Sequence, residues 1–273
     1  MSNTLFHRLI ETTNHGDAQV CPKPTIPIVS QWAQELLNFQ PDAIQKSVLD
    51  HEAHRLILCC ARQWGKTTIV AIKALHTAIF HPGTEIVVIS NSLKQAELLL
   101  SKVCQSAAVL GFPRKRVSGY ANSLHLPNGS KIFAVAGTEK SSRGYTAHIV
   151  VVDEAALVPD DVVGSASPTL LRTDGKLWLL STPHGQTGLF YNVWHDPELT
   201  DWFKVRATID DSPYASPAFI AEQKRLFPFN IRQDLYCEFT AKKGCLLTRE
   251  RVEKMIDLTI THIPFPRLLK DKI

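Results

Sequence analysis

The chain has 273 residues, of which 44% are hydrophobic and 21% are charged, and its formal net charge of +4 makes it mildly basic. This composition excludes a largely disordered chain, and it permits a nucleic-acid partner without showing one, because such binding depends on where basic residues cluster. The six cysteines lack the CxxC spacing of zinc sites, and no apolar run suits a signal peptide or a membrane span, so we expect a soluble cytoplasmic protein with reduced thiols.

Apolar runs alternate with helical stretches along most of the chain. After a mixed N-terminal extension over residues 1–40, strands are expected at 55–61, 85–90, 148–153 and 177–182, helices at 66–80 and 93–111, and two short strands around an Asn-Gly turn at 128–129. Nearly uninterrupted Val, Ile and Leu runs are typical of parallel strands buried on both faces. The pattern predicts a doubly wound α/β core over 41–210, with a mostly parallel sheet sandwiched by helices, and a small helical subdomain over 211–273.

The stretch ARQWGKTT, residues 61–68, lies between the first expected strand and a helix, which is the context of a phosphate-binding loop. Gly65 permits a tight turn that aims backbone N–H groups at phosphate oxygens, and the helix adds its positive N-terminal end. Lys66 would reach the β- and γ-phosphates of ATP, and the Thr67 hydroxyl would coordinate Mg²⁺. Alone, Gly-Lys-Thr also arises by chance, and Cys60 stands where the standard pattern has a glycine. The expected ATP-binding residues of the loop are Gln63, Trp64, Gly65, Lys66, Thr67 and Thr68.

HIVVVDEAA, residues 148–156, reads as a buried strand that ends in two carboxylates. At the end of a parallel strand near a phosphate loop, Asp153 can hold Mg²⁺, and Glu154 can polarise the water that attacks the γ-phosphorus. The alternative is that Asp153 merely caps the following helix. We expect Lys66 and the acidic pair to converge around one Mg·ATP at the tips of adjacent buried strands, which predicts ATP hydrolysis.

Several of these motifs together resemble the large terminase subunits of tailed phages, from about residue 38 to about residue 257. The phosphate loop RQWGKT resembles the form found in that family, which commonly replaces the first glycine. FQPDAIQKSVLD resembles its adenine-recognition segment, SSRGYTAHIVVVDEAA its Arg-Gly turn and acidic strand, and LWLLSTPHGQTGLFY its coupling motif. RQDLYCEF resembles the segment that closes the ATPase region.

The resemblance implies roles for further residues. Gln45 would read adenine, and the alternative is an exposed helix residue. Arg62 would contact the γ-phosphate and stabilise transition-state charge, and the alternative is a structural ion pair. Thr182 would sense the attacking water or the γ-phosphate, and the alternative is a plain turn before Pro183. Arg143 would face DNA or a neighbouring subunit.

The resemblance also implies a fold, an activity and partners. The fold is a P-loop NTPase of the additional-strand, catalytic-glutamate type. The activity is Mg-dependent ATP hydrolysis that powers translocation of double-stranded DNA in the host bacterial cytoplasm, without a membrane. The implied partners are a small terminase subunit, a portal and further copies of the chain in a ring. Two alternatives stay open: a non-catalytic prophage remnant that binds nucleotide or partners, and a helicase-like DNA-dependent ATPase.

Two further expectations concern DNA. Terminases usually continue into a nuclease whose carboxylates hold two metals, and beyond Glu253 the sequence offers only Asp257 and Asp271, so we expect no nuclease activity. The cluster PRKR at 113–116 could contact DNA phosphates, or it could consist of solvated loop charges. The same two readings apply to Lys140, Arg143, Lys224 and Arg225.

Overall fold

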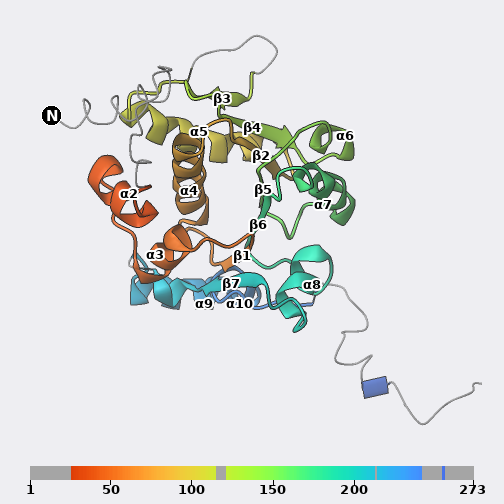
Figure 1. Ribbon diagram of the computed structural model, residues 1–273. Helices are drawn as coiled ribbons and strands as arrows, with labels where there is room; N and C mark the ends of the chain where they lie inside the picture. The colour runs from red at the N-terminus through yellow and green to blue at the C-terminus, as the bar shows by residue number, and fades with distance from the viewer. Residues whose placement is uncertain (1–25, 115–120, 213, 242–253, 256–273) are drawn as a thin grey trace, which may run out of the picture.

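A computed structural model of the protein describes residues 26–114, 121–212, 214–241 and 254–255, and a sheet lies at its centre (Figure 1). Its strands are β1 (Arg55–Cys60), β2 (Glu85–Ser90), β3 (Ser123–His125), β4 (Lys131–Ala136), β5 (Ile149–Asp153), β6 (Lys176–Ser181) and β7 (Trp202–Ala207). They lie in the order β3-β4-β2-β5-β6-β1-β7. Neighbouring strands are parallel, apart from the antiparallel pair of β3 and β4.

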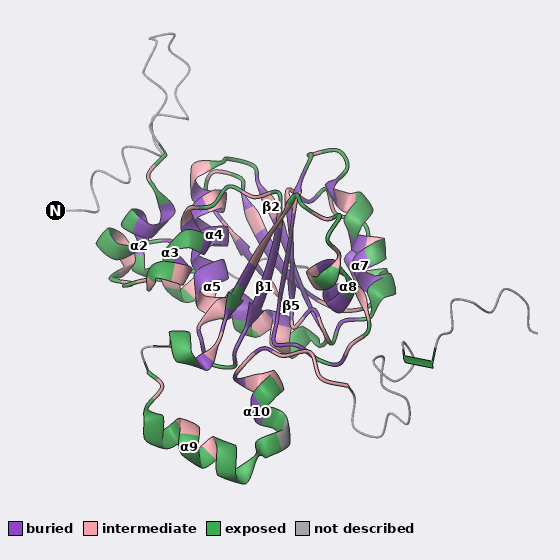
Figure 2. Cartoon of the chain, turned by 90° about the horizontal axis from the view of Figure 1, so that it is seen from below, coloured by how far each residue is buried: buried purple, intermediate pink, exposed green. Residues whose placement is uncertain are grey.

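Helices cover both faces of this sheet, as the edge-on view in Figure 2 shows. The helices are α2 (Val29–Leu37), α3 (Ala43–Asp50), α4 (Lys66–Phe80), α5 (Leu93–Val109), α6 (Glu139–Ser142), α7 (Asp160–Ala166), η1 (Ser167–Leu170), α8 (Leu189–His195), η2 (Ile209–Asp211), α9 (Pro217–Leu226) and α10 (Pro228–Asp234). Residues of α2 to α5 pack on one face, and residues of α7, η1 and α8 pack on the other. The predicted α/β fold, with a mostly parallel sheet between helical layers, is confirmed.

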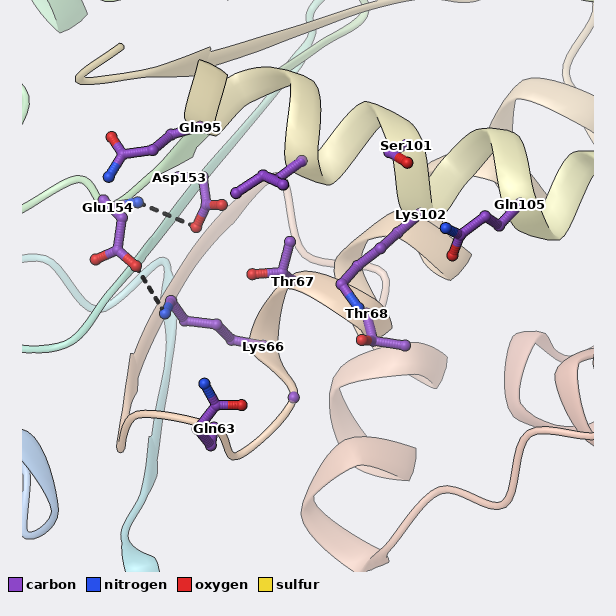
Figure 3. Close-up of a pocket in the computed structure, with 12 residues that line it drawn as sticks. Gln63, Lys66, Thr67, Thr68, Gln95, Ser101, Lys102, Gln105, Asp153 and Glu154 are labelled. Atoms are coloured by element: carbon purple, nitrogen blue, oxygen red, sulfur yellow. Dashed lines mark hydrogen bonds and ion pairs between the residues drawn. The ribbon is translucent and has the colours of Figure 1, made fainter. Parts of the chain in front are cut away.

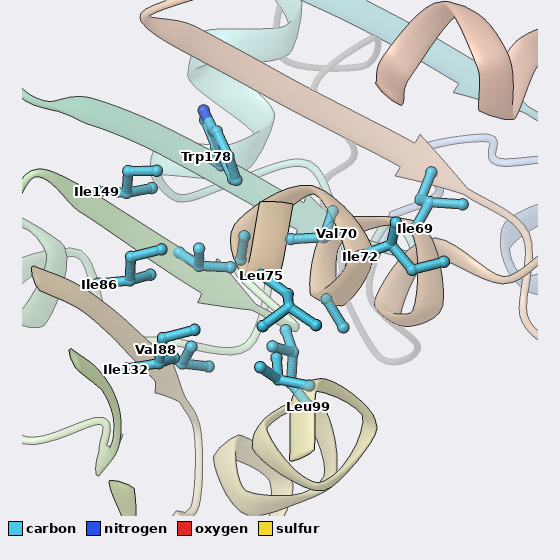
Figure 4. Packing of buried hydrophobic residues seen from close by; sticks show 14 of the residues in the cluster. Ile69, Val70, Ile72, Leu75, Ile86, Val88, Leu99, Ile132, Ile149 and Trp178 are labelled. Atoms are coloured by element: carbon cyan, nitrogen blue, oxygen red, sulfur yellow. The ribbon is translucent and has the colours of Figure 1, made fainter. Parts of the chain in front are cut away.

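Alternation along each strand explains why the strand sequences are apolar throughout. Leu56 and Leu58 of β1 belong to the core on the α4 side, whereas Ile57 and Cys59 belong to the core on the α7 side. Because successive side chains of a strand point to opposite faces, a sheet covered on both faces needs apolar residues at every position. Figure 4 shows how strand residues such as Trp178, which is fully buried, pack against α4 and α5.

The strand order corrects one expectation. The phosphate loop follows β1 and the acidic pair ends β5, but β6 lies between these two strands, so they are not adjacent. β6 pairs with both of them in parallel. The three strands therefore end at the same edge of the sheet, and the interposed β6 is the additional strand of the predicted fold type.

Part of the chain's C-terminal region is described. A small cluster of Ile209, Ile231 and Leu235 joins η2 to the end of α10, and α10 lies beside β7 (Figure 1). Residues 242–253 and 256–273 lie outside the described residues, as do residues 1–25, so the predicted domain boundaries stay predictions. Over the described part of the chain, we find no helix that is both long enough and apolar enough to cross a membrane.

Candidate active site

The loop between β1 and α4 has the backbone shape of an anion cradle. Gly65 adopts a φ of 107°, which suits glycine, and Gln63 adopts a left-handed φ of 65°. A Cβ atom at Gly65 would lie 3.2 Å from Nε2 of Gln45, so a side chain there would crowd its neighbour. Helix α4 begins at Lys66 without a side-chain cap, which leaves N–H groups of its first turn available to an anion.

A pocket of about 540 Å³ opens above this loop (Figure 3). It brings together seven residues predicted from the sequence, namely Gln63, Gly65, Lys66, Thr67, Thr68, Asp153 and Glu154. The opposite wall is a face of α5 that sequence reasoning missed, made of Gln95, Leu98, Ser101, Lys102 and Gln105. Their spacing marks one side of a helix, but the sequence does not say that this side faces the phosphate loop.

Lys66 and Glu154 form an ion pair in this pocket. The Lys66 Nζ lies 2.9 Å from Oε1 of Glu154, and the two side chains are 11% and 27% exposed. Glu154 has a left-handed φ of 53°, an uncommon conformation for a residue other than glycine. The turn after it is fastened to β6, because the Ala155 N–H donates to the Leu180 carbonyl at 2.9 Å.

Asp153 is a buried carboxylate beside that pair, 5% exposed. Its Oδ1 accepts a hydrogen bond from the Glu154 N–H at 3.0 Å. Burial raises the pKa of Asp153 to about 6, although the nearby Lys66 charge acts in the opposite direction. The next helix, α7, begins at Asp160 with Pro159 as its N-cap, so the alternative in which Asp153 caps that helix is wrong.

The oxygen donors at this point fit a magnesium ion. Asp153 and the Thr67 hydroxyl line the same pocket, and a buried carboxylate without a cation is costly. Among the residues that the structure describes, no group of three or more His, Cys, Asp or Glu could hold a metal. Mg²⁺ suits such a sparse site, because it is usually held by one or two protein oxygens together with phosphate oxygens and water.

Gln45 does not line the pocket, and each end of its amide makes one hydrogen bond. Its Oε1 accepts from the Asp42 N–H at 3.2 Å, and its Nε2 donates to the Trp64 carbonyl at 3.1 Å. The side chain is 9% exposed, so the alternative of an exposed helix residue is wrong. Trp64 is buried as well, and its indole nitrogen has no hydrogen-bond partner among the described residues.

Thr182 and Arg62 lie near the pocket without lining it. The Thr182 hydroxyl donates to the Cys60 carbonyl at 3.0 Å, which ties the end of β6 to the end of β1. The Arg62 side chain is 66% exposed, and its Nε lies 3.4 Å from Oδ1 of Asp234, as the ion-pair alternative describes. The Arg62 N–H also donates to the Asp234 carbonyl at 2.9 Å.

A second pocket, of about 370 Å³, lies between the phosphate loop and helices α9 and α10. Gln63 lines both pockets. Most of its surface is apolar. Its lining residues are Arg62, Gln63, Phe219, Gln223, Phe227, Asn230, Ile231, Asp234 and Leu235.

The basic residues singled out for DNA do not form one stripe. Arg114 donates from Nε to the Ser123 carbonyl at 3.0 Å, and Arg143 pairs with Glu139 on α6 at 2.8 Å. Lys224 of α9 lies 5.4 Å above the Tyr236 ring. Helix α6 lies beside β4 and α9 lies near β7, at opposite ends of the sheet (Figure 1). Residues 115 and 116 of the PRKR cluster lie outside the described residues.

Comparisons with known proteins agree with this fold. The sequence model of the family described as "Terminase large subunit, T4likevirus-type, N-terminal" matches residues 57–254. The terminase large subunit of Thermus phage G20c is 29% identical over 171 residues, which cover 55% of this chain and 35% of that protein, so the chain spans about a third of its length.

Two solved structures share the fold. The large terminase ATPase domain of Thermus phage P74-26 superposes with a TM-score of 0.66 at 22% identity, over 78% of this chain and all of that one. A large terminase from a thermophilic bacteriophage, solved in complex with ADP, gives a TM-score of 0.61 at 15% identity, over 78% of this chain and 52% of that one. The family match covers most of the sequence, and the chain is therefore a member of the terminase large subunit family, matching its N-terminal region.

Proposed function

We propose that this chain binds Mg·ATP in the pocket above the phosphate loop and hydrolyses it to drive movement of double-stranded DNA. This proposal rests mainly on the ion pair of Lys66 and Glu154, whose atoms lie 2.9 Å apart beside the buried Asp153. The two residues follow strands that are separated by β6. A cation, a metal-binding carboxylate and a candidate base then share one site at the carboxyl ends of parallel strands, where ligands of such sheets bind. Family membership and the ADP bound by the related terminase of a thermophilic bacteriophage support the same reading.

Each loop residue has a distinct task in the proposed reaction. Lys66 neutralises the β- and γ-phosphates, while N–H groups of the first turn of α4 donate to phosphate oxygens. Thr67 and Asp153 would hold Mg²⁺, which when bound neutralises charge that develops on the phosphates. Thr68 and Gln63, which line the pocket on either side of Lys66 in the sequence, would flank the phosphates.

Glu154 accepts the proton of the attacking water in this scheme. Its carboxylate faces Lys66 in the structure, so it is not free to receive a proton from water. The entry of a triphosphate draws Lys66 away, because several negative oxygens attract the ammonium more strongly than one carboxylate. Nucleotide binding thereby releases the base for catalysis.

The nucleobase fits the second pocket. A nucleotide joins a polar triphosphate to a flat apolar ring, and the two pockets that meet at Gln63 have these two characters. Phe219 and Phe227 offer rings for stacking. Gln45, the residue predicted to read adenine, lines neither of these two pockets, and its amide contacts Asp42 and Trp64 instead.

Arg62 and Thr182 would link the site to motion. Arg62 borders the second pocket and would reach the γ-phosphate after leaving Asp234. The Thr182 hydroxyl, which donates to the Cys60 carbonyl, joins the end of β6 to the end of β1, the strand that leads into the phosphate loop. We further propose that the chain acts on DNA as part of a ring of identical subunits, together with a small terminase subunit and a portal. Arg143 and Lys224 are candidates for contacts with DNA phosphates or neighbouring subunits.

Phosphate release from Mg·ATP, with and without duplex DNA, tests the proposal. Wild-type protein should release phosphate, and Lys66→Ala and Glu154→Gln should reduce turnover at least about a hundredfold, as loss of a central catalytic group does. Lys94→Ala removes an exposed lysine of α5 outside the pocket, and it should match wild type. Equal rates for wild type and Lys66→Ala would refute ATP hydrolysis at this site. Salt-insensitive or absent binding in a filter assay with duplex DNA, even with an ATP analogue, would refute the DNA part.

A further inference from the structure

The α5 wall of the pocket carries a side chain with no role in the scheme so far. Gln95 is the third residue of α5, and it lines the pocket together with Asp153 and Glu154. Figure 3 shows its amide end beside Glu154, whereas Lys102 and Gln105 lie toward the Thr68 end of the pocket. Gln95 is therefore the α5 residue placed next to the candidate base.

Two serine hydroxyls contact the oxygen of the Gln95 amide. Its Oε1 accepts from the Ser90 hydroxyl at 3.5 Å and from the Ser92 hydroxyl at 3.4 Å, both longer than a usual O–H···O hydrogen bond, so each contact is weak. Its own backbone N–H donates to Oγ of Ser92, the N-cap of α5. Ser90 is paired in register with Asp153 across β2 and β5, so this anchor is built into the sheet.

The nitrogen end of the same amide lies toward the candidate base. The Gln95 Nε2 makes no hydrogen bond within the part of the chain that the structure describes, although the amide oxygen makes two. An amide held by its oxygen presents two N–H donors at its other end. These donors lie at the Glu154 end of the pocket, where a carboxylate that has lost Lys66 needs a new partner.

We propose that Gln95 is a positioning residue for Glu154. The inference rests on the proposed function: once phosphate draws Lys66 away, the Gln95 amide donates to the Glu154 carboxylate or to the water beside it, and so fixes the direction in which the base receives a proton. A neutral donor suits this task, because it leaves the carboxylate free to accept the proton that an ammonium would exclude.

Steady-state ATP hydrolysis by the full chain separates this role from a structural one. Gln95→Ala removes the whole amide, whereas Gln95→Glu keeps an oxygen for Ser90 and Ser92 but loses the N–H donors. Both variants should lower kcat about tenfold or more, while KM and the affinity for a fluorescent ATP analogue stay within about twofold, since a misplaced base costs turnover rather than binding. Gln34→Ala, the same change on the exposed face of helix α2, should match wild type.

A double substitution shows whether Gln95 acts through Glu154. In a Glu154→Gln background, Gln95→Ala should cause no further loss of turnover, because the group that it positions has gone. Wild-type kcat in Gln95→Ala or Gln95→Glu, or a rise in KM at constant kcat, would overturn the inference alone. Additive losses in the double variant would do the same. A wild-type chain no more active than Lys66→Ala would overturn the proposed function, and this inference with it.

Discussion

The Lys66 ammonium lies 2.9 Å from the Glu154 carboxylate, although the two residues follow strands that do not touch. Parallel β6 between them brings both strand ends to the same edge of the sheet. Each charge is therefore already paired within the chain. In the proposed mechanism, nucleotide binding therefore replaces the Glu154 partner of Lys66 with phosphate.

Replacing Glu154 with Gln should tighten ATP binding even as it lowers turnover about a hundredfold or more. The change removes the carboxylate that competes with phosphate for Lys66, and a partly exposed ion pair contributes up to about 1 kcal/mol, or about fivefold in affinity. Titration with a fluorescent ATP analogue measures the effect. Glu139→Gln removes a carboxylate from an exposed pair with Arg143 and should leave affinity unchanged. Weaker binding by Glu154→Gln would contradict the exchange.

Asp234→Asn should also favour nucleotide binding, by freeing Arg62. The Arg62 side chain is 66% exposed and its Nε is 3.4 Å from the carboxylate, so the ion pair is weak and its loss costs little stability. If Arg62 moves to the γ-phosphate, the variant should bind ATP up to about threefold more tightly, and Arg62→Ala should abolish this gain. An unchanged affinity for ATP in Asp234→Asn would assign Arg62 a structural role.

Gly65→Ala should destabilise the fold and impair nucleotide binding. The φ of 107° disfavours any side chain, and the new Cβ would lie 3.2 Å from Nε2 of Gln45. A cost of about 1–3 kcal/mol in the free energy of unfolding is expected. Gly164→Ala is the matched control, because it lies within α7 with open space around it, and it should add about 0.5–1 kcal/mol. Denaturant unfolding measures both, and equal stabilities would refute the strained loop.

Thr182→Val should destabilise the protein, and Thr182→Ser should not. Valine has the shape of threonine but cannot donate to the Cys60 carbonyl, which the hydroxyl does at 3.0 Å in a buried position. The loss of a buried hydrogen bond costs about 1–3 kcal/mol. If the bond also couples β6 to the loop, kcat should fall in the valine variant and recover in the serine variant. Equal unfolding energies for the two variants would show that the bond is unimportant.

Acidification should destabilise the fold through His76. This histidine is buried, its Nε2 lies 2.9 Å from the Pro27 carbonyl, and desolvation lowers its pKa to about 4 from 6.5. Between these values the unfolded chain binds more protons than the folded chain, so the free energy of unfolding rises with pH through this window and falls on acidification. The full effect is on the order of 3 kcal/mol.

The His76 contribution is isolated by difference. His76→Phe keeps an aromatic ring against Trp32 and Phe80 and removes the proton-binding group. Asp153 acts in the opposite sense, because burial raises its pKa to about 6 and the folded chain then holds the extra proton. Urea unfolding of both proteins from about pH 4 to about pH 7 should therefore show a shallower, or even reversed, pH slope in His76→Phe. Parallel curves would contradict the assignment.

The sequence by itself determined the fold class, the family resemblance and the position of the phosphate loop between a strand and a helix. Strands β2 and β5 could be predicted because a sheet covered on both faces requires unbroken apolar runs, which local sequence shows. Lys66 and Asp153 could be predicted because their motifs combine a residue type with a position at a strand end. These patterns lie within short segments of the sequence, so they can be recognised without knowing which residues are neighbours in space.

Only the tertiary structure decided which side chains meet. Strand order placed β6 between the two motifs, and helix packing turned the Gln95 face of α5 toward Glu154. The tertiary structure also placed the Gln45 amide against the Trp64 carbonyl of the loop and Arg62 against Asp234. Such contacts join residues distant in the chain, so periodicity and composition, which describe a segment alone, do not contain them.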